Sequence, residues 1–324
     1  MCCLSIIIVN ANTRELACQC LASIERNSPR RHSEVIVVDN ASTDDSCEAI
    51  ETRFPFVKIV KNTENLGFSA ANNRGLAIAK GEYVLLLNSD TIVTPGSLDK
   101  MCEVADANNH VGVVAPKLVY LDGSLQMSYG PIPNLFGAFC TFFEIKRFFS
   151  PSILRRLGRS RWLPMFGKTV KDYVSWSSGG EPATKILTSN LLATGACLLI
   201  RRSCIEQVGV LDPNIFMYCD DADYCQRVHD EGWKILYLAE VTIVHIKGGT
   251  AGQRYRWTSA RAYESMLYFF RKHRGWVAFQ LARTFALLSL LLRGIIDSIR
   301  RRENASSSWA LFRAVARANG LPRA

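Results

Sequence analysis

The first 120 residues alternate short apolar runs with segments of helical pattern. Each run is rich in valine, isoleucine and leucine, as is typical of buried strands. The runs are Leu4 to Val9, Glu34 to Val38, Val57 to Val60 and Tyr83 to Leu87, with helical patterns between them near residues 14–26, 44–52 and 69–79. Strands that alternate with helices form parallel sheets, because each helix carries the chain back to the starting edge. The sequence therefore predicts an α/β fold whose Rossmann-like central sheet is mostly parallel and flanked by helices.

This pattern continues after residue 110 and is interrupted once. Residues 111–115, 117–120, 191–200 and 241–246 are apolar enough to form further strands, and a helical pattern follows Asp220. Residues 129–188 differ, because they contain prolines, glycines, an aromatic cluster and many basic side chains. We expect this insert to be a mobile excursion over the site rather than part of the core.

The net positive charge of the chain arises entirely from its last quarter. Residues 247–324 contain 15 Lys or Arg and three acids, whereas the remaining residues contain 24 basic and 26 acidic side chains. Within this tail, Trp276 to Ile299 is apolar except for Arg283 and Arg293, which leave nine residues between them. A helix needs about 20 apolar residues to cross a bilayer, so we expect this segment not to span one. Two interpretations remain: an amphipathic helix on an anionic membrane surface, or a core-packing helix with a solvated basic face.

Two of the expected strands end on an acidic residue. Asp39 closes the second apolar run, and Asp90 closes the Asn-Ser-Asp tip of the fourth. Ligands of open α/β sheets bind outside the carboxyl ends of the strands. One such acid could equally cap the following helix, but two together favour a polar ligand. No Gly-x-Gly-x-x-Gly turn follows any of these strands, which argues against a nicotinamide or flavin dinucleotide.

Two segments add further polar groups. Residues 65–75 could contact a nucleotide through amides and a guanidinium, or they could form an ordinary capped helix start. Asp220, Asp221 and Asp223 lie within four positions and would raise one another's pKa, which suits a general base. The alternative is that these acids only complement the positive end of a helix.

His245 ends the last strand-like run. A lone histidine after a strand is more often structural than a ligand. Its interest comes from Asp90, because a divalent metal held there would need a second protein ligand, while phosphate oxygens could complete the shell.

Five motifs occur in order along the chain. They are the strand followed by Asn10-Ala-Asn12, Val37-Val-Asp-Asn-Ala-Ser-Thr-Asp44, Asn65-Leu-Gly-Phe-Ser-Ala-Ala-Asn-Asn-Arg-Gly75, Leu86-Leu-Asn-Ser-Asp90 and Phe216-Met-Tyr-Cys-Asp-Asp-Ala-Asp-Tyr-Cys-Gln-Arg227. Taken together, these motifs resemble the family 2 inverting glycosyltransferases of GT-A fold. The similarity covers roughly residues 3 to 275 and, within the family, points to the bacterial rhamnosyltransferase-type group that builds O-antigen, exopolysaccharide or cell-wall glycans.

The resemblance implies a role for each motif. It makes Asp221 the catalytic base, places Asp220 and Asp223 on the acceptor side, and makes Asp90 and His245 the ligands of Mg²⁺ or Mn²⁺. The chain departs from the family pattern in two places: Asn88 replaces the first acid of the Asp-x-Asp motif, and Asp220 replaces a glutamate. The residues implied to bind the nucleotide sugar are Asn10, Asp39, Asn65, Gly67, Asn73, Ser89 and Asp90.

The resemblance also implies a domain plan and an activity. Residues 1–275 would form the GT-A domain, with a nucleotide-sugar half (1–125) and an acceptor half (126–250) that carries the 129–188 insert; residues 276–324 would form the basic apolar helical tail. The enzyme would transfer a sugar, with rhamnose the first choice, from dTDP-rhamnose or a UDP-sugar to a glycan or polyprenyl-diphosphate-linked acceptor. It would be cytoplasmic and peripheral on the inner face of the cytoplasmic membrane.

Two other functions are compatible with parts of the sequence. Asn88 weakens the metal motif, so a catalytically weak sugar-nucleotide binder is one alternative. The basic tail suggests a nucleic-acid binding protein, but the acids at 39, 90 and 220–223 would repel a polyanion, and we expect no nucleic-acid partner. The eleven cysteines are scattered without a Cys-x-x-Cys pair, which indicates a reducing cytoplasm rather than a disulfide scaffold.

Overall fold

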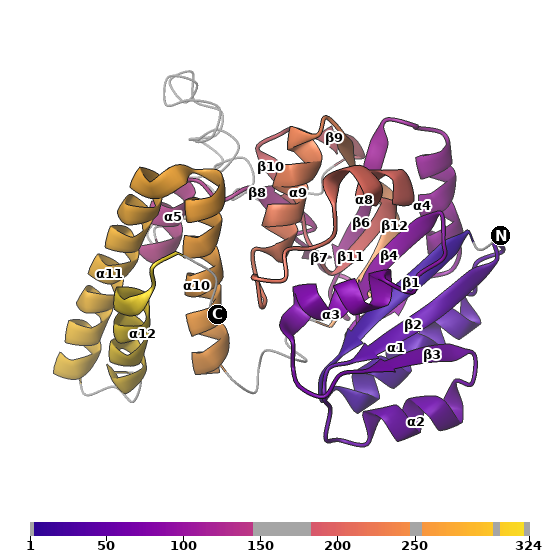
Figure 1. Ribbon diagram of the computed structural model, residues 1–324, viewed down its shortest axis with the longest axis horizontal. Coiled ribbons are helices and arrows are strands. Elements are labelled where there is room, and N and C mark those ends of the chain that lie inside the picture. The colour runs from indigo at the N-terminus through magenta and orange to yellow at the C-terminus, as the bar shows by residue number, and fades with distance from the viewer. Residues whose placement is uncertain (1–2, 145–182, 247–254, 301–304, 321–324) are drawn as a thin grey trace. The chain divides into compact units, whose positions relative to one another are not determined.

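The structure, a computed structural model, describes residues 3–144, 183–246, 255–300 and 305–320 (Figure 1). The chain divides into two compact units. The first, here called the sheet unit, comprises Met1–Gly130, Glu181–Phe216 and Asp220–Gln253. The second, the helical unit, comprises Pro131–Gly180, Met217–Cys219 and Arg254–Ala324.

A mixed sheet forms the centre of the sheet unit. Its main path runs β3-β2-β1-β4-β11-β6-β12-β5, with β7 paired to β6 and β9 paired to β12. The pairs β3-β2, β2-β1, β1-β4 and β6-β12 are parallel, whereas β11 and β5 run antiparallel to their neighbours. The predicted mostly parallel α/β sheet is therefore confirmed. The strands are β1 (Leu4–Asn10), β2 (Ser33–Asp39), β3 (Val57–Lys61), β4 (Tyr83–Asn88), β5 (Thr91–Val93), β6 (Val111–Val119), β7 (Leu125–Gln126), β9 (Lys185–Leu187), β11 (Cys197–Arg201) and β12 (Lys234–His245).

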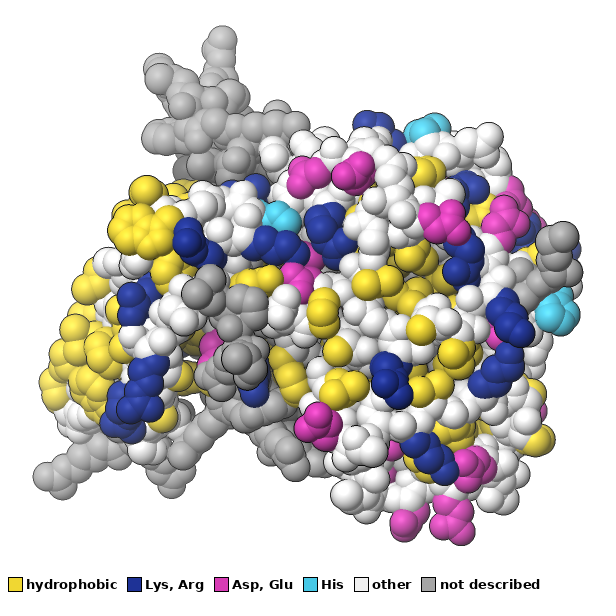
Figure 2. All heavy atoms as spheres, in the orientation of Figure 1, with side chains coloured by type: hydrophobic (Ala, Val, Ile, Leu, Met, Phe, Trp, Pro, Cys, Tyr) yellow, Lys and Arg dark blue, Asp and Glu magenta, His cyan; other side chains and the backbone are white. Residues whose placement is uncertain are grey.

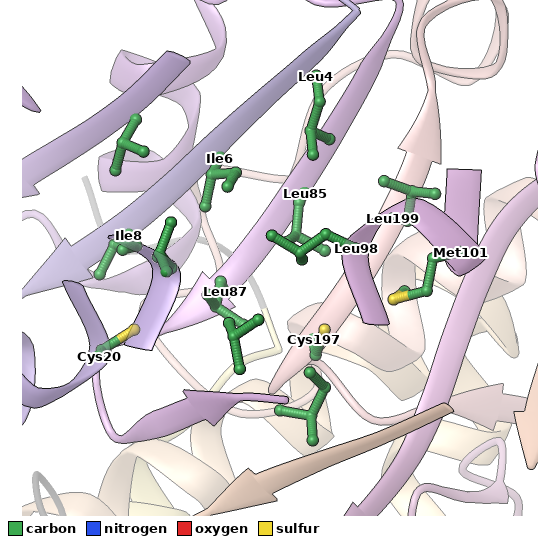
Figure 3. Close-up of a cluster of buried hydrophobic side chains, with 14 of the residues drawn as sticks. Leu4, Ile6, Ile8, Cys20, Leu85, Leu87, Leu98, Met101, Cys197 and Leu199 are labelled. Carbon is green, nitrogen blue, oxygen red and sulfur yellow. The ribbon is translucent and has the colours of Figure 1, made fainter. Parts of the chain in front are cut away.

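Helices cover both faces of this sheet, and successive strand residues supply the two cores. One face packs against α1 (Arg14–Arg26), α2 (Ser46–Arg53) and α4 (Ser97–Asp106), and the other against α3 (Gly67–Leu76), α8 (Arg202–Val208) and α9 (Asp220–Asp230). In β1, for example, Ile6 and Ile8 enter the first core and Ile7 enters the second. Figure 3 shows the first core, where Leu98 and Met101 of α4 meet leucines of the strands. The apolar runs are continuous because both faces of each strand are buried.

The strand boundaries differ from the expected ones in two places. Residues 111–119 form one strand, β6, although Pro116 interrupts the apolar pattern. Proline cannot donate to a ladder, and the β6-β12 register shifts immediately after the Pro116–Leu238 pair. Residues 191–200 divide instead, into β10 (Leu191–Ala193) and β11, with a turn at Gly195 between them; β10 pairs with β8 (Tyr129–Pro131).

The helical unit is built from α5 (Leu135–Phe142), α10 (Tyr255–His273), α11 (Gly275–Ile299) and α12 (Ala305–Arg317). Its core includes Phe142 of α5, Phe270 of α10, Phe279 and Leu290 of α11 and Val315 of α12. Gly275 has φ of 81°, a left-handed conformation that ends α10 and starts α11 in a new direction. A side chain at Gly294 would lie 2.9 Å from the Trp309 ring, so glycine allows α11 and α12 to approach closely.

These units divide the chain differently from the expected domains. Helix α10 belongs to the helical unit, so the compact boundary lies near residue 254 rather than 275. The first part of the insert expected at 129–188 lies in a core, because Ala138 and Phe142 of α5 are buried in the helical unit. Residues 145–182 of that insert lie outside the described residues.

The start of α3, at Gly67, contacts Phe216, which lies shortly before the acids at positions 220–223. The φ of Gly67 is 82°, and the next residue, Phe68, donates its N–H to the Phe216 carbonyl at 2.6 Å. A Cβ atom at Gly67 would lie 2.8 Å from the Phe216 ring. Gly123 has a similar φ of 78° in an exposed turn, but a Cβ atom there would meet nothing within 4 Å.

We therefore expect Gly67→Ala to destabilise the protein more than Gly123→Ala. Both changes cost about 1–2 kcal/mol for the left-handed backbone, and the clash at Gly67 adds about 1–3 kcal/mol. Chemical denaturation of the two variants and the parent chain measures the difference. Equal losses would show that the contact between residues 67 and 216 contributes nothing to stability.

Candidate active site

Polar side chains follow three adjacent strands of the sheet unit at the same edge. Asn10 ends β1, Asp39 ends β2, and Ser89 and Asp90 follow β4. The parallel register pairs Asn10 with Asp39 and Val9 with Asn88, so all three strands end at one level. The sequence thus places these polar groups together through strand pairing alone.

A continuous hydrogen-bond network links these strand ends. Asn10 donates from Nδ2 to Asp39 Oδ1 at 3.0 Å, and Asp39 Oδ2 accepts the Ser42 N–H at 3.0 Å. Thr13 donates its hydroxyl to Asn10 Oδ1 at 2.7 Å and lies 3.1 Å from the Ser89 hydroxyl. Every side chain of this network from Asn10 to Ser89 except Ser42 is buried, so the network fixes their orientations.

Asp90 and His245 lie side by side because of an antiparallel strand pair. His245 of β12 is opposite Thr91 of β5, and Ile246 donates its N–H to the Asp90 carbonyl at 2.7 Å. This pairing brings His245 Nε2 to 3.2 Å from Asp90 Oδ1. Both side chains are largely buried, at 12% and 8% exposed.

A carboxylate is a suitable ligand for Mg²⁺ or Mn²⁺, and an imidazole is a common ligand of divalent transition metals. Within residues 3–144, 183–246, 255–300 and 305–320, no cluster of three or more His, Cys, Asp or Glu side chains could hold a metal. Asp90 and His245 would leave the remaining positions of a divalent cation to ligands from outside the protein.

Asp220 and Asp221 begin α9, whose first turn also contains Asp223. The two residues before the helix, Tyr218 and Cys219, have φ of 63° and 59°. Left-handed conformations of such residues are unfavourable and are frequent at functional sites. The backbone thus adopts a costly turn that presents the two acids.

The Gly195 backbone forms a hydrogen bond to the Asp221 side chain. Asp221 Oδ2 accepts the Gly195 N–H at 3.1 Å, and Oδ1 accepts the Ala222 N–H at 2.8 Å. A Cβ atom at Gly195 would lie 3.4 Å from the Asp221 Cβ. The following residue, Ala196, accepts the N–H of Asn88 at 3.0 Å, so a short backbone path connects Asp221 to the strand end that carries Asp90.

The electrostatics of the acid pair favour proton uptake. Burial raises the pKa of Asp220 to about 8, and the neighbouring charge of Asp221 acts in the same direction. Burial also raises the pKa of Asp221, although the hydrogen bonds from Gly195 and Ala222 oppose this shift. Carboxyl groups with raised pKa values are suited to accept a proton near neutral pH.

Four of the residues implied to bind substrate also make contacts within the protein. Gly67 lies close to Phe216, and Asn65 Oδ1 accepts hydrogen bonds from Asn40 Nδ2 and from the Gly67 N–H, both at 2.9 Å. Asn73 donates to the Leu211 carbonyl at 2.8 Å and accepts the Leu211 N–H at 3.1 Å. Asp223 is fully buried and forms an ion pair with Arg227 at 2.9 Å. These contacts fix the loops around the candidate site.

The site also contains residues that the sequence did not single out. Gln126, Gly195 and Thr13 contact implied site residues, and Asn40 orients the loop at Asn65. Asn40 directly follows Asp39 in a motif, so it could have been found from the sequence. Gly195 and Gln126 carry no local signal, because their partners lie 26 and 119 residues away in the chain.

Known structures share this architecture. The chain is similar to the mannosyltransferase PcManGT from Pyrobaculum calidifontis in complex with GDP-Man and Mn²⁺, with 17% identity, a TM-score of 0.54, and coverage of 97% of this chain and 85% of that one. It is also similar to GalNAc-T7 with UDP, GalNAc and Mn²⁺, with 14% identity, a TM-score of 0.52, and coverage of 83% and 50%. These likenesses establish the GT-A fold.

The amino-acid sequence is also similar to those of known proteins. The chain is 28% identical over 300 residues to the N-acetylglucosaminyl-diphospho-decaprenol L-rhamnosyltransferase of Mycobacterium tuberculosis. The aligned residues cover 87% of this chain and 91% of that protein. It is 27% identical over 218 residues to the O-antigen biosynthesis protein RfbC of Myxococcus xanthus, covering 66% of this chain and 15% of that protein. Residues 5–165 match the model of glycosyl transferase family 2, so this chain contains a domain of that family.

Proposed function

We propose that the protein transfers a sugar from a nucleotide-diphosphate donor to a hydroxyl of a glycan or polyprenyl-diphosphate-linked acceptor, with inversion at the anomeric carbon. Rhamnose is the first candidate, from dTDP-rhamnose, with a UDP-sugar as the other donor. One observation carries the proposal: the acid pair Asp220–Asp221 and the pair Asp90–His245 are joined through residues 195–196 and Asn88. The similarity to a rhamnosyltransferase with a lipid-linked acceptor supports the choice of substrates.

The donor would lie along the polar strand ends. Asp39 and Asn10 are held rigidly at the ends of β2 and β1, where a ribose or base can meet fixed acceptors and donors. Ser89 and Asp90 follow on β4, toward the diphosphate. Asp90 and His245 would hold Mg²⁺ or Mn²⁺, which supplies electrostatic stabilisation of the diphosphate as it leaves.

Asp221 would act as the catalytic base. It would accept the proton of the acceptor hydroxyl while that oxygen attacks the anomeric carbon from the face opposite the leaving diphosphate. The hydrogen bonds from Gly195 and Ala222 hold its carboxylate in one orientation. Asp220 would remain beside it on the acceptor side.

The helical unit would bring the enzyme to its lipid-linked acceptor. Among the described residues, α11 is the one helix long and apolar enough to cross a membrane, and 28% of its most apolar window is buried. The two arginines that interrupt its apolar sequence both contact protein groups. Arg283 donates to the carbonyls of Val315 and Ala316, and Arg293 donates to Phe142 O and forms an ion pair with Glu144 at 2.8 Å.

Because both arginines contact protein groups, α11 exposes a face that is mostly apolar. The exposed side chains recur every three or four residues, with Thr284 filling the one longer interval, and are Val277, Leu281, Leu288, Leu292, Ile295 and Ile299. Figure 2 shows hydrophobic side chains gathered over this helix, with basic side chains beside them. Lys272, Arg274, Arg300, Arg313 and Arg317 are exposed in the same unit. This combination suits peripheral attachment to an anionic membrane surface, here the inner face of the cytoplasmic membrane.

Replacing Asp221 by Asn should abolish transfer while leaving donor binding intact. Loss of a general base costs about 10²–10⁴-fold in turnover. Transfer of labelled sugar from dTDP-rhamnose and UDP-sugars to a polyprenyl-diphosphate-linked glycan, with calorimetric donor binding, measures both quantities. Asp230→Asn, at the other end of α9, is the matched control and should keep full activity. Turnover by Asp221→Asn at the parent rate would reject the assignment.

Charged substitutions on the exposed face of α11 should release the protein from membranes. Two leucines that enter the lipid contribute about 1.5–3 kcal/mol each, so Leu288→Asp with Leu292→Asp should weaken vesicle binding more than tenfold. Flotation with phosphatidylglycerol-containing vesicles measures this, and Leu121→Asp, an exposed leucine of the sheet unit, is the control. If the double variant floats as the parent does, α11 is not the lipid contact.

A further inference from the structure

Gln126 lies behind His245 in the metal-binding pair. Its Oε1 is 2.6 Å from His245 Nδ1, on the side of the ring opposite the Nε2 that faces Asp90. An amide oxygen can only accept a hydrogen bond, so the Nδ1 atom carries the hydrogen in this arrangement. A neutral ring in this tautomer presents the lone pair of Nε2 toward Asp90.

The strands fix Gln126 in this place. Gln126 of β7 pairs with Leu118 of β6, and β6 lies between β7 and β12 in the sheet. The Ser128 hydroxyl accepts the Leu118 N–H at 2.7 Å and donates to the Gln126 carbonyl at 3.2 Å. Gln126 is only 6% exposed, so its side chain has little freedom to turn away from the ring.

The glutamine is costly for stability at this position. Its Nε2 atom is buried and has no hydrogen-bond partner among the described residues. A buried donor without a partner costs about 1–3 kcal/mol, which an apolar side chain of similar size would avoid. Stability therefore does not explain why a glutamine occupies position 126, whereas its hydrogen bond to His245 does.

We infer that Gln126 is a positioning residue that holds His245 with Nε2 bare and directed at the cation site beside Asp90. The inference rests on the proposed function, because it assigns a partner to the proposed metal ligand. Partners of this kind orient a ligating histidine and select its tautomer. Gln126 itself touches neither the cation nor the sugar.

Two substitutions separate the acceptor oxygen from the shape of the side chain. Gln126→Met keeps the size and removes the acceptor, and it should weaken Mn²⁺ binding by about 10–100-fold. Gln126→Glu keeps an acceptor oxygen beside Nδ1 and should restore most of the affinity. Mn²⁺ titration followed by electron paramagnetic resonance, with UDP or dTDP present, measures binding without any turnover.

The tautomer of His245 gives a second readout. Nitrogen NMR of histidine-labelled protein with Mg²⁺ should show the hydrogen of His245 on Nδ1 in the parent chain and in Gln126→Glu, but a mixture of tautomers in Gln126→Met. A simple packing defect would change stability without moving this signal. A hydrogen on Nε2 in the Mg²⁺-loaded parent would overturn the inference.

His245→Ala distinguishes the two levels of the proposal. If His245→Ala loses Mn²⁺ affinity while Gln126→Met keeps it, the metal site stands and the role of Gln126 is wrong. If His245→Ala itself binds Mn²⁺ as the parent does, the proposed metal site fails and the role of Gln126 fails with it.

Discussion

The in-register pairing of β1 with β2 and β4 is the constraint on which the site depends. Because the three strands are parallel and end at one level, their terminal polar residues meet without any dedicated loop. The buried hydrogen bonds from Asp39 through Asn10 and Thr13 to Ser89 then lock these side chains. A slip of one residue in any of these pairs would turn the polar groups into the apolar core.

Antiparallel pairing completes the site from distant parts of the chain. β5 brings Asp90 to His245, and β11 runs antiparallel beside β4, so that Gly195 and Ala196 connect Asp221 to Asn88. Asn73 and Phe68 form hydrogen bonds to Leu211 and Phe216 in the segment that leads to α9. Residues that first suggested nucleotide contacts thus also help to fix the loop that leads to Asp220 and Asp221.

The sequence predicted what local patterns determine. The apolar runs of β1, β2 and β4 and the acids at their ends follow from strand period and strand ends, and the family motifs pointed to Asp221 and His245. It did not predict contacts that depend on which strands pair, such as Gln126 with His245 and Gly195 with Asp221. The inward contacts of Arg283 and Arg293 were missed for the same reason, because the side of α11 that they occupy depends on α5 and α12.

The central claim is that Asp90 and His245 hold the cation that binds the diphosphate of the donor. Calorimetric titration of UDP and dTDP, with Mn²⁺ and with EDTA, tests it most directly in the parent chain and in Asp90→Asn. The structure predicts that Mn²⁺ strengthens binding of one of these nucleotides to the parent and that Asp90→Asn loses this dependence. An equal gain from Mn²⁺ in the parent and in Asp90→Asn would contradict the claim.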